Sequence, residues 1–129
     1  MESTELRIGN IVSHEPTIDD WEEIVVKPGT IIQCEISPDS YEPVLLTNKW
    51  LLKLGFTVRD DKYAHLNLPS SGAYIYINQS GTGVALENEE GFELCYSVEL
   101  KYVHQVQNLY FTLTGKELII NNYEKSTLG

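Results

Sequence analysis

The chain has 129 residues, of which 42% are hydrophobic and 22% are charged, and it contains 9 glycines and 5 prolines. This composition is typical of a single globular domain with a real core, and it argues against a disordered or fibrous chain. The net charge of −10 repels nucleic-acid phosphates and anionic lipid headgroups, so direct nucleic-acid binding is not expected. The same charge would attract a basic partner protein, although many acidic proteins use it only to remain in solution.

The two cysteines and the first residues of the chain indicate the expected compartment. Cys34 and Cys95 lie far apart in apolar, strand-like runs, so we expect reduced core thiols and no disulfide. The first residues carry no basic segment, and no apolar run approaches the ~18 residues of a membrane span. We therefore expect a protein of the cytoplasm that makes no contact with a membrane.

Residues 5–36 contain short β-branched groups separated by turn residues, which predicts a strand-rich segment. Pro28 and Gly29 suit the two central positions of a type II turn. We therefore expect strands at 23–27 and 30–36 to pair as a hairpin. Hairpins of this kind would form a small sheet or part of a barrel.

Two stretches without a clear period, 13–20 and 37–43, are predicted to be loops. A short helix is predicted over 47–54, where apolar residues recur at helical spacing. Thr47 is its expected N-cap, and Gly55 is its expected left-handed C′ residue.

From residue 56 to residue 97 the apolar period falls to two, which predicts an antiparallel meander. Turn signals recur about every ten residues, as expected for four or five strands that pair in sequence. The run Gly81-Thr82-Gly83 is interpreted as a hairpin turn. A phosphate-binding loop would normally open a helix, and a strand follows here.

A longer helix is predicted over 99–114, with Ser97 as a candidate N-cap and Gly115 at C′. Its apolar stripe, expected to face the sheet, consists of Tyr102, Val103, Val106, Leu109, Tyr110 and Leu113. A short strand at 117–120 and a frayed tail at 121–129 complete the chain. The predicted fold class is α+β, with one longer C-terminal helix packed on an antiparallel meander.

Tyrosine supplies 8 of the 13 aromatic residues, and its spacing suggests a binding face. Strand alternation places Tyr74 and Tyr76 on one face, and Tyr63 with His65 on one face of the neighbouring strand. Such a platform suits stacking on a planar ligand such as a nucleobase, or contact with a protein partner. Alternatively, the same side chains pack under the longer helix or the N-terminal strands.

The polar face of the longer helix is a second candidate. Lys101, His104, Gln105 and Asn108 offer donors and acceptors at helical spacing on the side opposite the apolar stripe. This face would bind a ligand through polar contacts. Alternatively, it is a solvated face or caps a neighbouring loop.

The sequence contains no catalytic or metal-binding signature. His14, His65 and His104 lack the spacing of helical metal ligands, and no nucleophile elbow is present. The neighbouring pairs of acidic residues lack the spacing of a calcium loop. We therefore expect no cofactor and no metal, and we assign no catalytic residue. An enzyme that used His104 as a general base would need a nucleophile or metal that the sequence does not supply.

Three segments support a resemblance that covers nearly the whole chain. They are Leu6-Arg7-Ile8-Gly9-Asn10, then Leu46-Thr47 with Trp50-Leu51-Leu52 and Gly55-Phe56, and finally the stretch from Lys101 to Gly115. This combination resembles a family of small uncharacterised proteins encoded in phages and mobile elements of gut anaerobes. The chain is longer than many such relatives between the first two segments, and Val106 and Thr112 stand where Leu and Ala are expected. The resemblance implies an accessory protein of the bacterial cytoplasm but no activity.

Two functions follow as hypotheses. In the first, the chain is a non-enzymatic binding protein that sequesters a small nucleotide-like ligand or blocks a host factor, for example in counter-defence. In the second, it is an acidic interaction module that occupies a basic site on a host protein. A homo-oligomer is possible, and a dimer would strengthen the first hypothesis because small binding proteins often place ligands between subunits. A structural accessory role is a further alternative.

Overall fold

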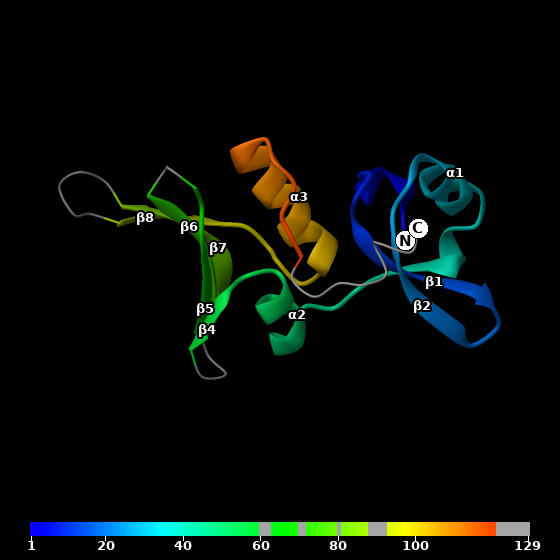
Figure 1. Cartoon of the computed structure of the whole chain (residues 1–129), viewed down its shortest axis with the longest axis horizontal. Coiled ribbons are helices and arrows are strands. Elements are labelled where there is room, and N and C mark those ends of the chain that lie inside the picture. The colour runs from blue at the N-terminus through cyan, green and yellow to red at the C-terminus, as the bar shows by residue number, and fades with distance from the viewer. Residues whose placement is uncertain (60–62, 70–71, 80, 88–92, 121–129) are drawn as a thin grey trace.

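The protein forms two antiparallel sheets, of three and five strands, in a computed structural model. The structure describes residues 1–59, 63–69, 72–79, 81–87 and 93–120. The two sheets lie at opposite ends of the molecule, with helix α3 (Val103–Thr114) between them (Figure 1). The predicted α+β fold class is confirmed, and the N-terminal strands form a small sheet.

The three-stranded sheet has the order β2-β1-β3. Its strands are β1 (Ile11–Thr17), β2 (Asp20–Val25) and β3 (Tyr41–Pro43). The loop predicted over 13–20 is therefore wrong, because most of this stretch belongs to the β1–β2 hairpin. The hairpin is largely polar and exposed at its tip, so it lacks the apolar alternation that marks a half-buried strand.

Helix α1 (Pro28–Ile36) replaces the strand predicted over 30–36, and the predicted turn at Pro28 is wrong. Proline is tolerated in the first helical turn because its missing N–H has no helical partner there. Thr30 Oγ1 accepts a hydrogen bond from Lys27 N (3.2 Å), which stabilises the start of the helix. The helix covers a small buried cluster formed by Val12, Val26, Cys34 and Tyr41.

The five-stranded sheet is the predicted meander, with the order β4-β5-β6-β7-β8 and every neighbouring pair antiparallel. Its strands are β4 (Thr57–Arg59), β5 (Tyr63–Asn67), β6 (Ala73–Asn78), β7 (Gly81–Glu87) and β8 (Glu93–Ser97). Gly81, Thr82 and Gly83 lie inside β7, so the turn predicted there is wrong. The strand predicted at 117–120 is absent from the described part of the chain, and the predicted tail at 121–129 lies outside the described residues.

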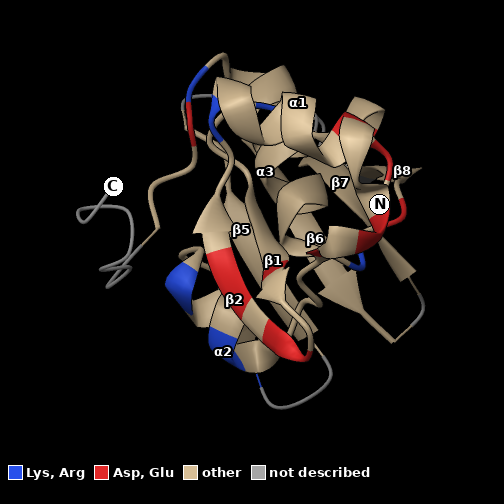
Figure 2. Ribbon diagram, turned by 90° about the vertical axis from the view of Figure 1, so that its right-hand side faces the viewer, with Lys and Arg blue, Asp and Glu red and all other residues tan. Residues whose placement is uncertain are grey.

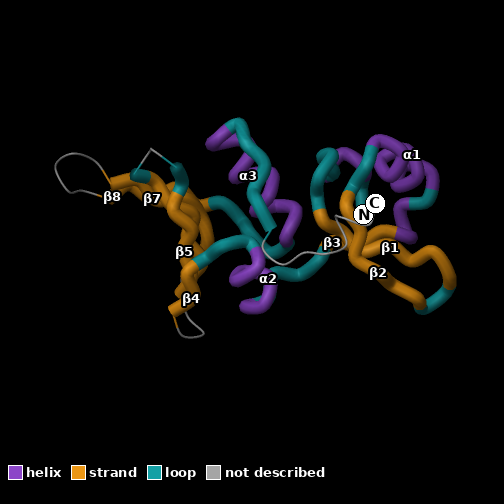
Figure 3. Tube along the Cα trace, viewed as in Figure 1, coloured by secondary structure: helices purple, strands orange, loops and turns teal. Residues whose placement is uncertain are grey.

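Helix α2 (Asn48–Lys53) confirms the short helix predicted from the sequence. Thr47 Oγ1 accepts a hydrogen bond from Trp50 N (3.3 Å), which satisfies one of the free N–H groups at the helix start. Gly55 follows the helix with φ of 92°, a conformation that side chains with a Cβ rarely adopt. Helices α2 and α3 pack on the same face of the five-stranded sheet (Figure 3).

Helix α3 begins at Val103, later than the predicted residue 99. The predicted N-cap, Ser97, still belongs to β8, and the residues that follow it run in an extended conformation to the start of α3, alongside residues 44–46. Leu46 N donates to Lys101 O (2.8 Å) and Val103 N donates to Val44 O (2.9 Å). These long-range hydrogen bonds compete with helix formation, so the helix starts only after them.

The end of α3 was predicted correctly, since Gly115 takes a left-handed conformation with φ of 72°. Most of its predicted apolar stripe also packs on the five-stranded sheet, but Leu113 is 46% exposed.

The principal core consists of Ile11, Val44, Trp50, Leu51, Leu54, Phe56, Ala64, Leu68, Ile75, Leu100, Val103 and Val106.

Candidate functional site

One face of the five-stranded sheet is not covered by any described helix. We call the face that packs on α2 and α3 the inner face, and the opposite one the outer face (Figures 1 and 3). Alternation along the strands sends the apolar side chains, such as Ala64 and Ile75, to the inner face. Tyr63, Tyr74 and Tyr76 therefore project from the outer face.

Three predicted tyrosines meet on the outer face. They border a shallow depression of about 400 Å³, whose lining is Tyr63, Tyr74, Tyr76, Asn78, Gly81, Cys95 and Ser97. The strand register explains the grouping, because Tyr76 is paired with Gly83, and Gly83 with Ser97, across three strands. The alternative that these rings pack under the longer helix is therefore wrong.

The fourth predicted residue, His65, lies beside the depression. It pairs with Tyr76 across β5 and β6, and its ring centroid is 5.6 Å from that of Tyr63 and 6.2 Å from that of Tyr74. His65 Nδ1 is buried without a hydrogen-bond partner among the described residues. The sequence thus identified a real cluster of aromatic side chains.

Small residues of β7 lie on the outer face beside the tyrosine rings, and Gly81 among them lines the depression. Gly81 and Gly83 carry no side chain, and Ala85 on the same face has only a methyl group. A Cβ at Gly83 would lie 3.0 Å from Tyr76 Oη and would overlap the backbone oxygen of Tyr96. Glycine therefore lets the aromatic side chains of β6 lie over the neighbouring strand.

The described residues that line the depression are uncharged, and the nearest described cation by strand register is Arg59. Arg59 pairs with Tyr63 across β4 and β5, so both side chains project from the outer face. Asn78 and Ser97 add polar groups at the rim. This combination offers flat apolar surface, a few hydrogen-bonding groups and one positive charge to one side.

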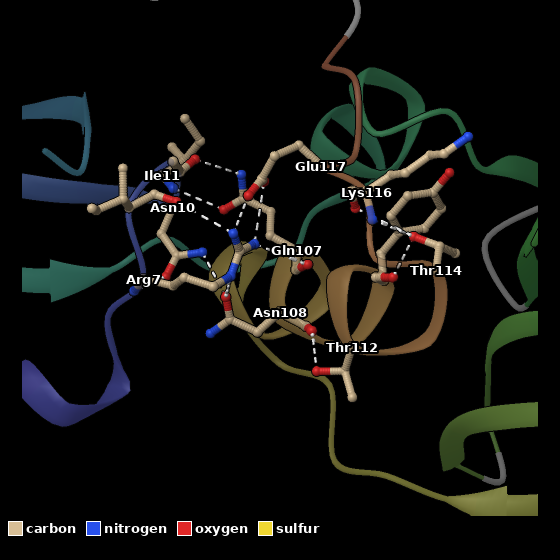
Figure 4. A network of polar contacts seen from close by, with 12 residues as sticks. Arg7, Asn10, Ile11, Gln107, Asn108, Thr112, Thr114, Lys116 and Glu117 are labelled. Carbon is tan, nitrogen blue, oxygen red and sulfur yellow. Dashed lines mark hydrogen bonds and ion pairs between the residues drawn. The ribbon is translucent and has the colours of Figure 1, made fainter.

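The predicted polar residues of α3 lie on the other side of the sheet and form a separate group. Asn108 Oδ1 accepts hydrogen bonds from Asn10 Nδ2 (2.7 Å) and Arg7 Nε (3.1 Å) (Figure 4). Gln105 Oε1 accepts from the backbone N of Lys101 (2.7 Å), at the start of the helix. These contacts fit the alternative reading of this face, in which it caps a neighbouring segment.

Lys101 lies just before the helix, and its Nζ is 3.5 Å from an exposed Glu99 carboxylate. His104, Gln105 and Asn108 border a second, more open groove of about 360 Å³. The two predicted groups of residues do not form a single site, because the five-stranded sheet separates them.

Two residues that the sequence did not single out join α3 to the N-terminal segment. Gln107 is 1% exposed; its Oε1 accepts from Ile11 N (2.8 Å) and its Nε2 donates to Gly9 O (3.0 Å). Arg7 forms an ion pair with Glu117. The only local signal for the role of Gln107 was an amide side chain beside the apolar stripe of the predicted helix. The backbone groups that it binds lie nearly one hundred residues earlier in the chain.

His104 is buried between α3 and the first residues of the chain. It is 2% exposed, and its Nε2 lies 3.8 Å from Glu5 Oε1. Its ring stacks on Tyr102 with centroids 5.9 Å apart, and its Nδ1 has no hydrogen-bond partner among the described residues. Burial lowers the pKa of the His104 imidazole, while the Glu5 carboxylate acts in the opposite direction.

The lowered pKa of His104 predicts that acid destabilises the fold. The unfolded chain binds the proton near pH 6.5 and the folded chain binds it only at lower pH, so stability falls as pH decreases below that value. His104→Gln should reduce this fall when urea unfolding is measured between about pH 7.5 and about pH 5.5. Glu5→Gln should steepen it, because the opposing carboxylate is removed. An unchanged pH dependence in His104→Gln would contradict the assignment.

The two cysteines have different environments. Cys34 is buried in α1, where burial raises the pKa of its thiol. Cys95 is free and exposed in β8, so its prediction as a core thiol is wrong. The alternation of β8 sends Cys95 to the outer face, which carries no covering helix in the described structure.

Within the described ranges, no three His, Cys, Asp or Glu side chains gather in a way that would hold a metal ion. None of the helices described is long and apolar enough to cross a membrane. A scan against protein-family models, a search of curated proteins and a search of solved structures each find no match to this chain.

Proposed function

We propose that the chain is a non-enzymatic binding protein that holds a planar, nucleotide-like ligand on the outer face of the five-stranded sheet. The observation that supports this proposal is the meeting of Tyr63, Tyr74 and Tyr76 around a depression that Gly81 also lines. Aromatic rings around a shallow floor suit a flat ligand, since stacking of one base on an aromatic side chain contributes about 1–3 kcal/mol.

The chemistry of the depression favours the base over the phosphate. The residues described in its lining carry no charge, and the whole chain carries a net charge of −10, which repels phosphate-rich ligands. Asn78 and Ser97 provide hydrogen-bonding groups for the edge of a base. A single phosphate would lie best toward Arg59, which flanks Tyr63.

The proposed setting is a bacterial cell in which the chain acts as a phage or mobile-element accessory protein. This setting rests on the resemblance of the three sequence segments. In such a cell, a protein that captures a nucleotide-like ligand would remove a signal or a substrate from solution, as in counter-defence.

A second candidate function is docking on a basic protein surface, and the β1–β2 hairpin favours it. Ile18 is 89% exposed and Trp21 is 38% exposed near the tip of this hairpin. Acidic residues surround them along β2, as Figure 2 shows. An exposed aromatic anchor within an acidic rim is suited to a positively charged partner.

The two functions can be separated by binding measurements with matched variants. Adenosine, guanosine and their 5′-monophosphates serve as probes in native mass spectrometry and calorimetry. We expect Tyr74→Leu to weaken binding by about 5-fold to 100-fold, because leucine keeps apolar volume but removes the stacking surface. Trp21 is an exposed aromatic residue on the hairpin, so Trp21→Leu is the matched control and should leave ligand affinity unchanged.

Salt provides a further distinction. Ligand capture on the uncharged depression should change little between about 0.1 M and about 1 M NaCl, whereas docking through the acidic hairpin should weaken strongly. If no nucleoside or nucleotide binds, or if Tyr74→Leu binds as the wild type does, the proposed ligand site is wrong.

A further inference from the structure

Strand β8 forms one edge of the five-stranded sheet, and its backbone has a defined open side. Val98 N donates to Thr82 O (3.0 Å), so these two residues form a hydrogen-bonded pair just beyond the strand. In an antiparallel ladder such pairs alternate, so Tyr96 and Leu94 direct their backbone groups toward β7. Cys95 therefore directs its N–H and C=O away from the sheet, as do residues 93 and 97.

The open edge lacks the features that usually prevent edge-to-edge pairing. The sequence of β8, Glu-Leu-Cys-Tyr-Ser, contains neither lysine nor proline, and its register with β7 runs without a bulge. Leu94 is 47% exposed and Tyr96 is 60% exposed, both on the inner face. Among the described residues no strand pairs with this edge, and an edge of this kind with exposed apolar side chains favours the addition of another strand.

We propose that β8 pairs with β8 of a second copy of this chain, antiparallel and around a two-fold axis at Cys95. In this register Cys95 faces the partner's Cys95, and Leu94 faces the partner's Tyr96. Each exposed apolar side chain then gains an apolar neighbour on the same face. Position 93 pairs with position 97 of the partner in this register, so the sequence places no two acidic positions opposite each other.

The strand is self-complementary in this register, which is why a second copy fits better than an unrelated peptide. The resulting sheet is continuous across both copies, and both outer faces lie on the same side. Cys95 and Ser97 line the tyrosine depression, so the partner's Cys95 and Ser97 would extend its rim. The pairing itself does not depend on whether the depression binds a ligand.

The net charge of −10 per chain opposes association, although the paired strands contribute only Glu93 to it. Salt screens the repulsion between the bodies of the two copies while the apolar contacts persist. The fraction of dimer should therefore rise with ionic strength. An interface held by ion pairs would respond in the opposite way.

The position of Cys95 provides a direct test. Hydrogen-bonded residues across an antiparallel pair have Cα atoms about 5.5 Å apart, within the range that a disulfide spans. Oxidised glutathione accepts the two electrons and two protons of the thiols as the Cys95 disulfide forms. We expect a covalent dimer on a non-reducing gel for wild type and for Cys34→Ser, and none for Cys95→Ser. A double variant, Cys95→Ser with Thr57→Cys, moves the thiol to β4, the opposite edge strand of the sheet. This variant should form no covalent dimer.

Light scattering of the reduced protein tests the same interface without cross-linking. The double variant Leu94→Lys, Tyr96→Lys places charges beside the axis at positions that are already exposed, so it should fold and shift the protein to monomer. Leu52→Lys, at an exposed leucine of α2, is the matched control and should remain dimeric. A monomer at every concentration and salt, or a dimer that neither cross-links through Cys95 nor responds to the double variant, overturns the proposal. Neither readout uses a ligand, so a failure of the ligand site leaves the result interpretable.

Discussion

Replacing Gln107 with leucine is expected to destabilise the protein by about 2–4 kcal/mol. The substitution keeps the volume of the side chain but removes both hydrogen bonds that it makes with the N-terminal segment. Ile11 N–H and Gly9 C=O then lose their partner in a buried place, and each unsatisfied group costs about 1–3 kcal/mol. Urea unfolding measures the loss, and amide hydrogen exchange should show faster exchange at Ile11.

Thr112→Ala provides the control for Gln107→Leu, because Thr112 lies on the same helix and is exposed. This change should alter stability by less than about 0.5 kcal/mol. A loss below about 1 kcal/mol for Gln107→Leu would mean that water satisfies the two backbone groups and that the contact contributes little.

The second large effect is expected for Gly83→Ala. The new Cβ would overlap the backbone oxygen of Tyr96 and lie 3.0 Å from Tyr76 Oη. Strands β7 and β8 would have to move apart to relieve the overlap, so we expect a loss of about 3 kcal/mol or more, at the upper end of overpacking effects.

Gly29→Ala is the matched control for Gly83→Ala. Gly29 lies in the first turn of α1, and a Cβ there would meet nothing within 4 Å. Alanine favours the helix over glycine, so a gain of up to about 1 kcal/mol is expected. If both glycine variants had the same thermal stability as the wild type, the close packing at Gly83 would be refuted.

The parts of the fold that were predicted correctly depend on local signals. The period-two alternation of the meander strands, the Thr47 cap and the left-handed Gly115 all act within a few residues of their own position, while most of the predicted turns of the meander lie outside the described residues. The tyrosine face could also be predicted, because a period of two fixes which side chains share a face of a strand.

The errors have a common physical cause in long-range contacts. Pro28 and Gly29 are compatible with both a turn and a helix start, and Ile31 and Ile32 have a high strand propensity. The helix forms because it covers the buried cluster around Cys34, and packing overrides a weak local preference. The role of Gln107 could not be predicted for the same reason, because it depends on where the N-terminal segment crosses α3.

The contacts of Arg7 and Gln107 also constrain how the chain folds during synthesis. Ile11 meets its side-chain acceptor 96 residues further along the chain, and Arg7 meets Glu117 after 110 residues. At about 5–20 residues per second, a ribosome needs roughly 5 to 20 s to make the intervening segment. The β1–β2 hairpin can pair early. The segment before it, which contains Arg7 and Gly9, has no native partners until α3 has emerged from the ribosome. The last helix to be made therefore completes the first part of the fold.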